Sequence, residues 1–369
     1  MPRPIALVLR PHALAHNLQL IRAATPADRR LWAVAKADAY GHGVALAVKA
    51  FAAADGLAVL DLAEAEAARA LGWTKPILLL EGLFGPADVS RVLAIEADLV
   101  FHHARQFSWW REPLEAGLVS DNIRHWLKLN TGMNRLGFKT ADAPVLKAAA
   151  ETLRNSGHAV GWLTHFARAE EPGGTDLQRQ VFCDWLDALD VPPHEARSTC
   201  NSAATWCGLA QPAEWVRPGL SLYGASPFAS DAGRSASGLG LMAAASLETQ
   251  VISIQALNIG ETVGYGSRWT AMRPSRIGVV AAGYADGYPR TAPDGTPVLV
   301  RGCRCPLVGQ VSMDMLTVDL TDHPHLDEAD PVTLWGDGLG VDEVAAACGT
   351  TAYELLTGVT PRVPRHTGG

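Results

Sequence analysis

The sequence predicts a parallel α/β barrel of the (β/α)8 type, followed by a mostly-β domain. Between residue 30 and about residue 240, short apolar runs alternate with alanine-rich segments of helical periodicity. We count eight of these strand–helix candidates, the number that closes a barrel. Beyond residue 240 the runs are of β type, and turn signals such as Pro293-Asp294-Gly295 separate them.

Each predicted barrel strand is a short run rich in apolar residues. The runs are residues 31–35, 56–60, 77–80, 99–102, 125–129, 160–165, 197–201 and 215–223. Helices are expected between them, for example over 63–71 and 87–97, where apolar residues recur at helical spacing. A strand over 5–9 and a helix over 14–24 precede the barrel.

The second domain is expected to contain short strands and little helix. The predicted strands are 251–254, 276–281, 297–300, 316–320 and 331–335, and the predicted helices are 342–347 and 351–357. Residues 226–240 are rich in serine and glycine, so we expect the join there. This gives a barrel domain over residues 1–235 and a β domain over residues 236–369.

Composition narrows the class of protein. A chain of 369 residues, 48% of them hydrophobic, is long enough for two domains with large cores. The net charge of −7, without a basic stripe, argues against a nucleic-acid partner. The apolar stretches are too short to span a bilayer, and the N-terminal run lacks the features of a signal peptide. Six cysteines without a C-x-x-C pair indicate reduced thiols, no metal site and a cytoplasmic protein.

Lys36 is the sharpest candidate for a catalytic residue. It closes the apolar run that begins at Leu31 and stands at the expected rim of the barrel. Burial lowers the pKa of a lysine, which favours the free amine that a Schiff base requires. Position alone leaves open the alternative of a structural lysine that extends its charged end into solvent.

Other polar residues follow later strands and are expected on the same rim. Arg135 lies past the fifth run, His165 ends the sixth, and Asn201 and Ser202 follow the seventh. For His165 alone, a structural histidine with satisfied hydrogen bonds is an equal alternative. Arg217 lies within the eighth run, where an unpaired charge would be costly, and this favours a functional role.

Ser202 and the backbone of Gly219 and Leu220 follow the last two strands, where barrels often bind phosphate. Small residues allow backbone N–H groups to approach phosphate oxygens. Ordinary turn chemistry is the alternative explanation for these residues.

Residues 33–43, AVAKADAYGHG, resemble the cofactor-lysine segment of alanine racemases. Further motifs occur in the order and spacing of that family: TGMNRLGF at 131–138, THF at 164–166, NSA at 201–203, RPGLSLYG at 217–224, VGYG at 263–266, GYADGYPR at 283–290 and SMD at 312–314. The ordered set covers essentially the whole chain. The resemblance is greatest to the proteobacterial branch, which includes catabolic enzymes.

The resemblance implies a barrel that binds pyridoxal 5′-phosphate. It implies that Lys36 attaches the cofactor and is one base, that Arg217 faces the pyridine nitrogen, and that His165 supports Arg217. The other implied cofactor residues are Tyr40, Asn201, Ser202, Gly219, Leu220 and Tyr353.

The resemblance also implies a homodimer whose subunits share their active sites. Tyr265 is then the second base, supplied by the other subunit. Arg135 and the backbone of Met313 bind the carboxylate of a small amino acid. In some relatives the lysine at the position of Lys128 is carbamylated and orients the arginine.

The implied reaction is the interconversion of L-alanine and D-alanine. Inversion removes a proton from one face of Cα and returns one to the other face, so it requires two bases. An arginine keeps its proton and leaves the ring nitrogen largely unprotonated, which disfavours transamination. A racemase of serine or basic amino acids stays open, because pockets discriminate weakly between similar side chains. A decarboxylase of this fold should have an acid in place of Arg217, and a non-catalytic carrier should lack the β domain.

Overall fold

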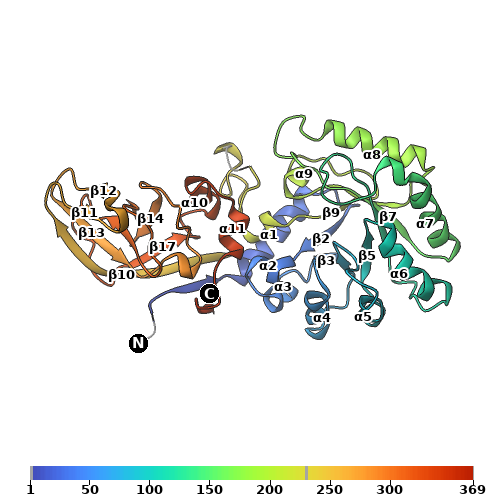
Figure 1. The fold of residues 1–369 in the computed structure, drawn as a ribbon, viewed down its shortest axis with the longest axis horizontal. Helices are drawn as coiled ribbons and strands as arrows, with labels where there is room; N and C mark the ends of the chain where they lie inside the picture. The colour runs from blue at the N-terminus through green and yellow to red at the C-terminus, as the bar shows by residue number, and fades with distance from the viewer. Residues whose placement is uncertain (1–2, 229–231, 369) are drawn as a thin grey trace. The chain divides into compact units, whose positions relative to one another are not determined.

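A computed structural model of the protein describes residues 3–228 and 232–368 (Figure 1). The chain divides into two compact units, one of residues 1–17, 40–42 and 223–369 and one of residues 18–39 and 43–222. We call the first the β unit and the second the barrel unit. Residues 229–231 of the predicted join lie outside the described residues, and the domain boundary at 235/236 stays a prediction. No described helix is long and apolar enough to cross a membrane.

The barrel unit contains an eight-stranded parallel sheet, which confirms the predicted fold class. Its strands in spatial order are β8 (Ala196–Ser198), β7 (Val160–Leu163), β6 (His125–Lys128), β5 (Asp98–Phe101), β4 (Ile77–Leu79), β3 (Gly56–Val59), β2 (Arg30–Val34) and β9 (Trp215–Val216). Each of the eight predicted runs overlaps one of these strands.

The barrel is nearly closed, with one weak junction between its terminal strands β8 and β9. No ladder joins these two strands, and their contact is an isolated bridge between Arg197 and Glu214. Two backbone hydrogen bonds cross the junction: Arg197 N–H donates to the Ala213 carbonyl at 3.0 Å, and Arg217 N–H donates to the Cys200 carbonyl at 2.8 Å. We call this junction the seam.

The predicted strand over 215–223 was too long. Strand β9 ends at Val216, and the residues from Leu220 to Tyr223 form a 3₁₀ turn, η2. Pro218 has no N–H to donate to a neighbouring strand, which ends the ladder. The Leu222 N–H then bonds the Gly219 carbonyl at 2.9 Å, so the chain turns over the rim of the barrel.

Helices surround the barrel strands (Figure 1). They are α1 (Pro11–Ala24), α3 (Val44–Ala50), α4 (Leu62–Ala70), α5 (Asp88–Ile95), α6 (Ala104–Glu115), α7 (Ala143–Asn155), α8 (Asp176–Ala188) and α9 (Ser202–Trp206). The segment labelled α2 (Lys36–Tyr40) has a left-handed backbone and forms a turn after β2. Helix α7 shows the pattern that makes them, because Leu146, Ala149, Ala150 and Leu153 recur at helical spacing and are all buried. The predicted helices over 63–71 and 87–97 correspond to α4 and α5.

The β unit contains a second eight-stranded sheet, so the mostly-β second domain is confirmed. Its main path is β15 (Cys303–Pro306), β14 (Pro297–Val300), β17 (Pro331–Trp335), β10 (Ala245–Leu257), β1 (Ala6–Leu9) and β18 (Arg365–Thr367), and β13 (Ser275–Val280) pairs with β10 and with β16 (Leu316–Asp319). A short hairpin, β11 (Thr262–Val263) and β12 (Trp269–Thr270), and helices α10 (Val341–Ala347) and α11 (Ala352–Thr357) complete the unit.

Strand β10 is longer than the predicted strand over 251–254. Its 13 residues pair with β1 and β17 near the amino end and with β13 near the carboxyl end. The first three residues are all buried, so they lack the alternating pattern by which a half-exposed strand is recognised.

Candidate active site

Lys36 follows strand β2 and begins a turn of unusual handedness. The next four residues, 37–40, have φ values of 54°, 52°, 52° and 53°. Left-handed backbone costs non-glycine residues roughly 1–2 kcal/mol each. Such strain persists only where surrounding contacts impose it, and it is concentrated at functional sites.

Two carboxylates hold the start of this turn in the barrel unit. The Asp38 N–H donates to Glu64 Oε1 at 3.0 Å, and Asp38 Oδ1 accepts the Val44 N–H at 3.0 Å. The other oxygen of Glu64 accepts the Leu60 N–H at 3.0 Å. Glu64 therefore fastens the turn after β2 to the end of β3. This role is not visible in the sequence, where Glu64 is only an acidic residue near the start of a predicted helix.

The environment of Lys36 favours its neutral amine. Burial lowers its pKa below the ordinary value, and the positive charge of Arg135 lowers it further. The carboxylates of Glu81 and Glu64 oppose this shift. The direction of this pKa shift agrees with the expectation that burial favours the free amine of Lys36.

Lys128, Arg135 and His165 are brought together around a small cavity of about 10 Å³. Burial first, and then the charges of Arg217 and Arg135, lower the pKa of Lys128 to about 8. Burial and the charge of Arg217 lower the pKa of His165 to about 3. His165 is therefore a neutral imidazole at neutral pH, in a cluster that is rich in positive charge.

Arg217 is a buried cation whose described hydrogen bonds go to neutral oxygens. Its Nη2 donates to the Thr164 carbonyl at 2.6 Å, and its Nη1 donates to Ser198 Oγ. Burial lowers the pKa of Arg217 to about 10, which still leaves it charged at neutral pH. As expected from the sequence, this buried charge meets acceptors: the carbonyl of Thr164, just after β7, and the hydroxyl of Ser198, in β8.

Ser202 and Gly219, both predicted at the phosphate, are in contact. The Gly219 N–H donates to Ser202 Oγ at 2.9 Å. Asn201 caps helix α9, because its Oδ1 accepts the Ala204 N–H at 3.0 Å. Leu220 follows at the start of η2 and is buried. The turns after β8 and β9 are thus joined where phosphate was expected.

Tyr40 and Tyr353 lie together in the β unit. The Tyr40 ring stacks on Tyr223 with centroids 4.5 Å apart, and its centroid is 5.8 Å from that of Tyr353. Burial raises the pKa of Tyr40 well above its ordinary value, so its hydroxyl stays protonated. The two tyrosines predicted near the phosphate are therefore neighbours.

Tyr265 projects from the turn between β11 and β12. The residue is 73% exposed, which is unusual for a large aromatic residue. The flanking Gly264 and Gly266 have φ values of 69° and 73°, which non-glycine residues adopt only with strain. The turn therefore holds Tyr265 out into solvent within a single chain.

Met313 lies on a segment that is fastened to η5 (Tyr284–Asp286). The Ala285 N–H donates to the Met313 carbonyl at 3.0 Å, and the Tyr284 N–H donates to the Ser312 carbonyl at 3.0 Å. The Met313 N–H has no hydrogen-bond partner among the described residues. It is therefore free to bind a carboxylate, as the family resemblance implies.

Asp286 anchors this segment and was missed as an individual residue. It is buried, it accepts a hydrogen bond from Arg3 at 2.8 Å, and it forms an ion pair with Arg362 at 2.8 Å. Arg362 also binds Asp314, next to Met313, at 2.6 Å. The motif at 283–290 contains Asp286, but nothing in the sequence links it to arginines at both ends of the chain.

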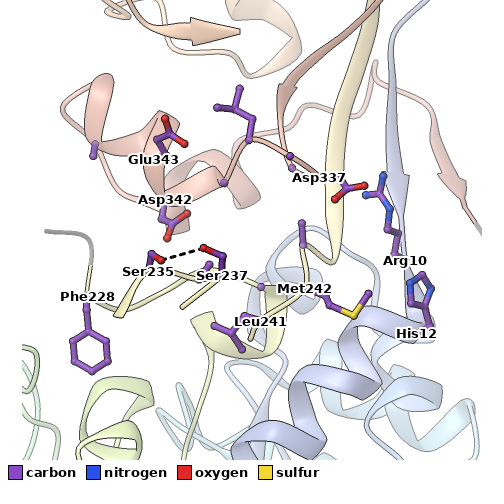
Figure 2. Close-up of a pocket in the computed structure, with 18 residues that line it drawn as sticks. Arg10, His12, Phe228, Ser235, Ser237, Leu241, Met242, Asp337, Asp342 and Glu343 are labelled. Atoms are coloured by element: carbon purple, nitrogen blue, oxygen red, sulfur yellow. Dashed lines mark hydrogen bonds between the residues drawn. The ribbon is translucent and has the colours of Figure 1, made fainter. Parts of the chain in front are cut away.

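The β unit also contains a cavity of about 840 Å³ that none of the predicted site residues lines. Figure 2 shows Asp337 beside Arg10, and Asp342 on the side of Ser235. Arg10 is already bound to Ser246 Oγ at 2.6 Å and to Glu248 at 3.2 Å.

Comparison with known proteins identifies the class. The chain matches the family model for the alanine racemase N-terminal domain over residues 9–227 and the one for the C-terminal domain over residues 244–367. It therefore belongs to the alanine racemase family.

Individual relatives match the chain over essentially its full length. The chain is 49% identical to an alanine racemase of Bordetella petrii, over 99% of both chains. The crystal structure of the biosynthetic alanine racemase from Pseudomonas aeruginosa is 45% identical, with a TM-score of 0.89 and full coverage of both chains. The alanine racemase from Bartonella henselae, with covalently bound pyridoxal phosphate, is 25% identical, with a TM-score of 0.87 and full coverage of both chains.

Proposed function

We propose that the protein interconverts L-alanine and D-alanine with pyridoxal 5′-phosphate as its cofactor. The observation that carries this proposal is the joint arrangement at the barrel rim. Three features lie just after barrel strands. They are the amine of Lys36 with its lowered pKa, the buried charge of Arg217, and the contact between Ser202 and Gly219. Full-length membership of the alanine racemase family supports the same reaction.

The donor set fits the cofactor. A neutral lysine amine suits an aldehyde, and a hydroxyl beside a backbone N–H suits phosphate oxygens. A guanidinium that keeps its proton suits an acceptor nitrogen of a ring. Lys36 supplies the amine, Ser202 and Gly219 supply the hydroxyl and the N–H, and Arg217 supplies the guanidinium. The other proposed cofactor contacts are Tyr40, Asn201, Leu220 and Tyr353.

The cofactor supplies an electron sink for the electron pair that remains when the α-proton of an amino acid leaves. The protein must place a base on each face of the α-carbon. The lowered pKa of Lys36 increases the fraction of free amine, the form that can accept a proton. Tyr265 of the partner subunit is the proposed second base, which accounts for a tyrosine that is exposed in one chain.

The substrate carboxylate has two proposed partners. Arg135 provides a charge beside Lys128 and His165, and the Met313 N–H provides a directed donor. We propose that Met313, like Tyr265, acts from the partner subunit, so the working form is a homodimer with shared sites. The six free cysteines favour a reducing compartment, and we place the protein in the cytoplasm.

Racemisation of L-alanine beside L-serine, L-lysine and L-arginine tests the function, with the D-enantiomers resolved by chiral chromatography. We expect alanine to be racemised with the highest kcat/KM. The purified protein should also be yellow, and borohydride should fix the cofactor to the wild type and to the Lys49→Ala control, but not to Lys36→Ala. A colourless protein that ignores added pyridoxal phosphate would refute the proposal.

Mixing two inactive variants tests the shared site. A dimer of one Lys36→Ala subunit and one Tyr265→Ala subunit contains one site with both bases intact. We therefore expect mixed variants to recover part of the activity once subunit exchange is shown by mass spectrometry. Exchange without recovered activity would contradict a base that comes from the partner.

A further inference from the structure

Glu214 is a buried carboxylate that the proposed mechanism does not use. It lies just before β9, on one side of the seam, and its residue is 1% exposed. Its Oε1 accepts the backbone N–H groups of Thr199 and of Cys200, the latter at 3.2 Å. Its Oε2 has no hydrogen-bond partner among the described residues. A buried carboxylate is costly, so its retention needs a reason.

The location of these two N–H groups supplies the reason. Residues 199 and 200 continue β8 toward the rim, at the seam, where no ladder strand accepts their hydrogen bonds. Backbone N–H groups that are buried without an acceptor are strongly unfavourable. The side chain of Glu214 takes the place of the missing strand and closes the seam at this level.

The proposed phosphate site lies directly after the residues that Glu214 bonds. Asn201 and Ser202 follow directly after Cys200, and Ser202 Oγ accepts the N–H of Gly219 from the other side of the seam. Arg217 lies between Glu214 and Gly219 on that side, and its N–H crosses the seam to the Cys200 carbonyl. The spacing between the two turns therefore depends on how tightly the seam is held.

We propose that Glu214 is a positioning residue of the cofactor site: by bonding the N–H groups of Thr199 and Cys200 across the seam, it sets the Ser202–Gly219 turn that receives the phosphate. This inference rests on the proposed function, because it assumes that the phosphate binds there. Burial raises the pKa of Glu214, and the nearby guanidinium of Arg217, whose hydrogen bonds go to neutral oxygens, opposes this shift.

Two variants of nearly equal size separate the hydrogen bonds from the volume. Glu214→Gln keeps an oxygen acceptor for both N–H groups, whereas Glu214→Met fills the same space and accepts neither. The apoenzymes are titrated with pyridoxal 5′-phosphate and with pyridoxal, which lacks the phosphate, and tryptophan fluorescence reports binding. The readout is the ratio of the two dissociation constants, which isolates the phosphate contribution.

We expect Glu214→Met to reduce the preference for pyridoxal phosphate over pyridoxal by about tenfold, and Glu214→Gln to stay within about threefold of the wild type. An equal loss for both ligands would indicate a merely structural role and would overturn the proposal, as would a Met variant that matches Gln. If the Met variant does not fold, Glu214→Asp, one methylene shorter, must lose at least about threefold of the preference. A wild-type apoenzyme that binds neither ligand would instead refute the proposed function.

Discussion

The backbone N–H of Gly219 donates a hydrogen bond to the hydroxyl of Ser202 at 2.9 Å, and this contact joins the turns after strands β8 and β9. Because the hydroxyl oxygen is the acceptor, its own proton is left to donate to another group. A hydroxyl proton beside backbone amides at the carboxyl end of barrel strands is well suited to an anion.

Ser202→Ala should weaken pyridoxal phosphate binding by about tenfold, because a hydrogen bond to a charged acceptor is lost. The affinity for pyridoxal should change little. Titration of the apoenzyme with each ligand measures both effects. Ser108→Ala removes an exposed helix hydroxyl that bonds the Arg105 carbonyl, and it serves as the control. Equal affinities of Ser202→Ala and the wild type would contradict the assigned phosphate site.

His165 should make the apoenzyme sensitive to acid. Its pKa is about 3 in the folded protein against an ordinary value of 6.5, so the folded chain binds fewer protons than the unfolded chain between these values. Stability from this residue is therefore present above pH 6.5 and is lost as the pH falls toward 3. At pH 5 the loss should reach about 2 kcal/mol.

Urea unfolding of the apoenzyme at pH 7, 6 and 5 measures this loss. His165→Gln should lose less stability over the range than the wild type, whatever its stability at pH 7. His12→Gln, which changes an exposed histidine, should follow the wild-type curve. Parallel curves for the wild type and His165→Gln would show that His165 is not held neutral.

The barrel was predictable because strands such as β3 and β4 are buried apolar runs with both faces covered, and polar residues follow them at the rim. The end of strand β9 at Val216 was less visible in the sequence, since Leu220 and Leu222 continue the apolar pattern after Pro218 has ended the ladder. In the β unit, β18 pairs with β1 from opposite ends of the chain, and a three-residue exposed strand carries no apolar signal.

The candidate site was predictable only where a polar residue stands out against an apolar strand. Lys36, Arg217 and Ser202 interrupt or follow apolar strands, so their types and positions are informative by themselves. Glu64, Glu214 and Asp286 act by accepting hydrogen bonds from backbone or side chains that are distant in sequence or across the seam. A single carboxylate, whether in a helix or in a loop, has no local pattern that reveals such a role.

Ala37→Gly should stabilise the apoenzyme or leave it unchanged. Ala37 has a φ of 54° and an exposed methyl group, so glycine relieves left-handed strain and loses little burial. Ala148→Gly, in the middle of the right-handed helix α7, should instead cost about 1 kcal/mol. Urea unfolding of both variants gives the comparison. A cost at Ala37 equal to that at Ala148 would show that the turn after Lys36 is not strained.

Asp286→Asn should impair both stability and substrate binding. The carboxylate is buried between Arg3 and Arg362, and its loss leaves two arginines facing a neutral amide, at a cost of about 2 kcal/mol. Arg362 and the Ala285 N–H hold the segment of Met313, so that segment should loosen as well.

The expected effect of Asp286→Asn on substrate binding can be measured separately from its effect on stability. If the Met313 N–H binds the substrate carboxylate, Asp286→Asn should raise the KM for alanine several-fold and should leave the affinity for pyridoxal phosphate unchanged. Asp322→Asn, which breaks an exposed ion pair with Arg273 in the same unit, should alter neither stability nor KM noticeably. An Asp286→Asn enzyme that is less stable but keeps the wild-type KM would show that Asp286 supports the fold and not the substrate segment, because unfolding alone lowers the amount of active enzyme without changing the KM of the folded fraction.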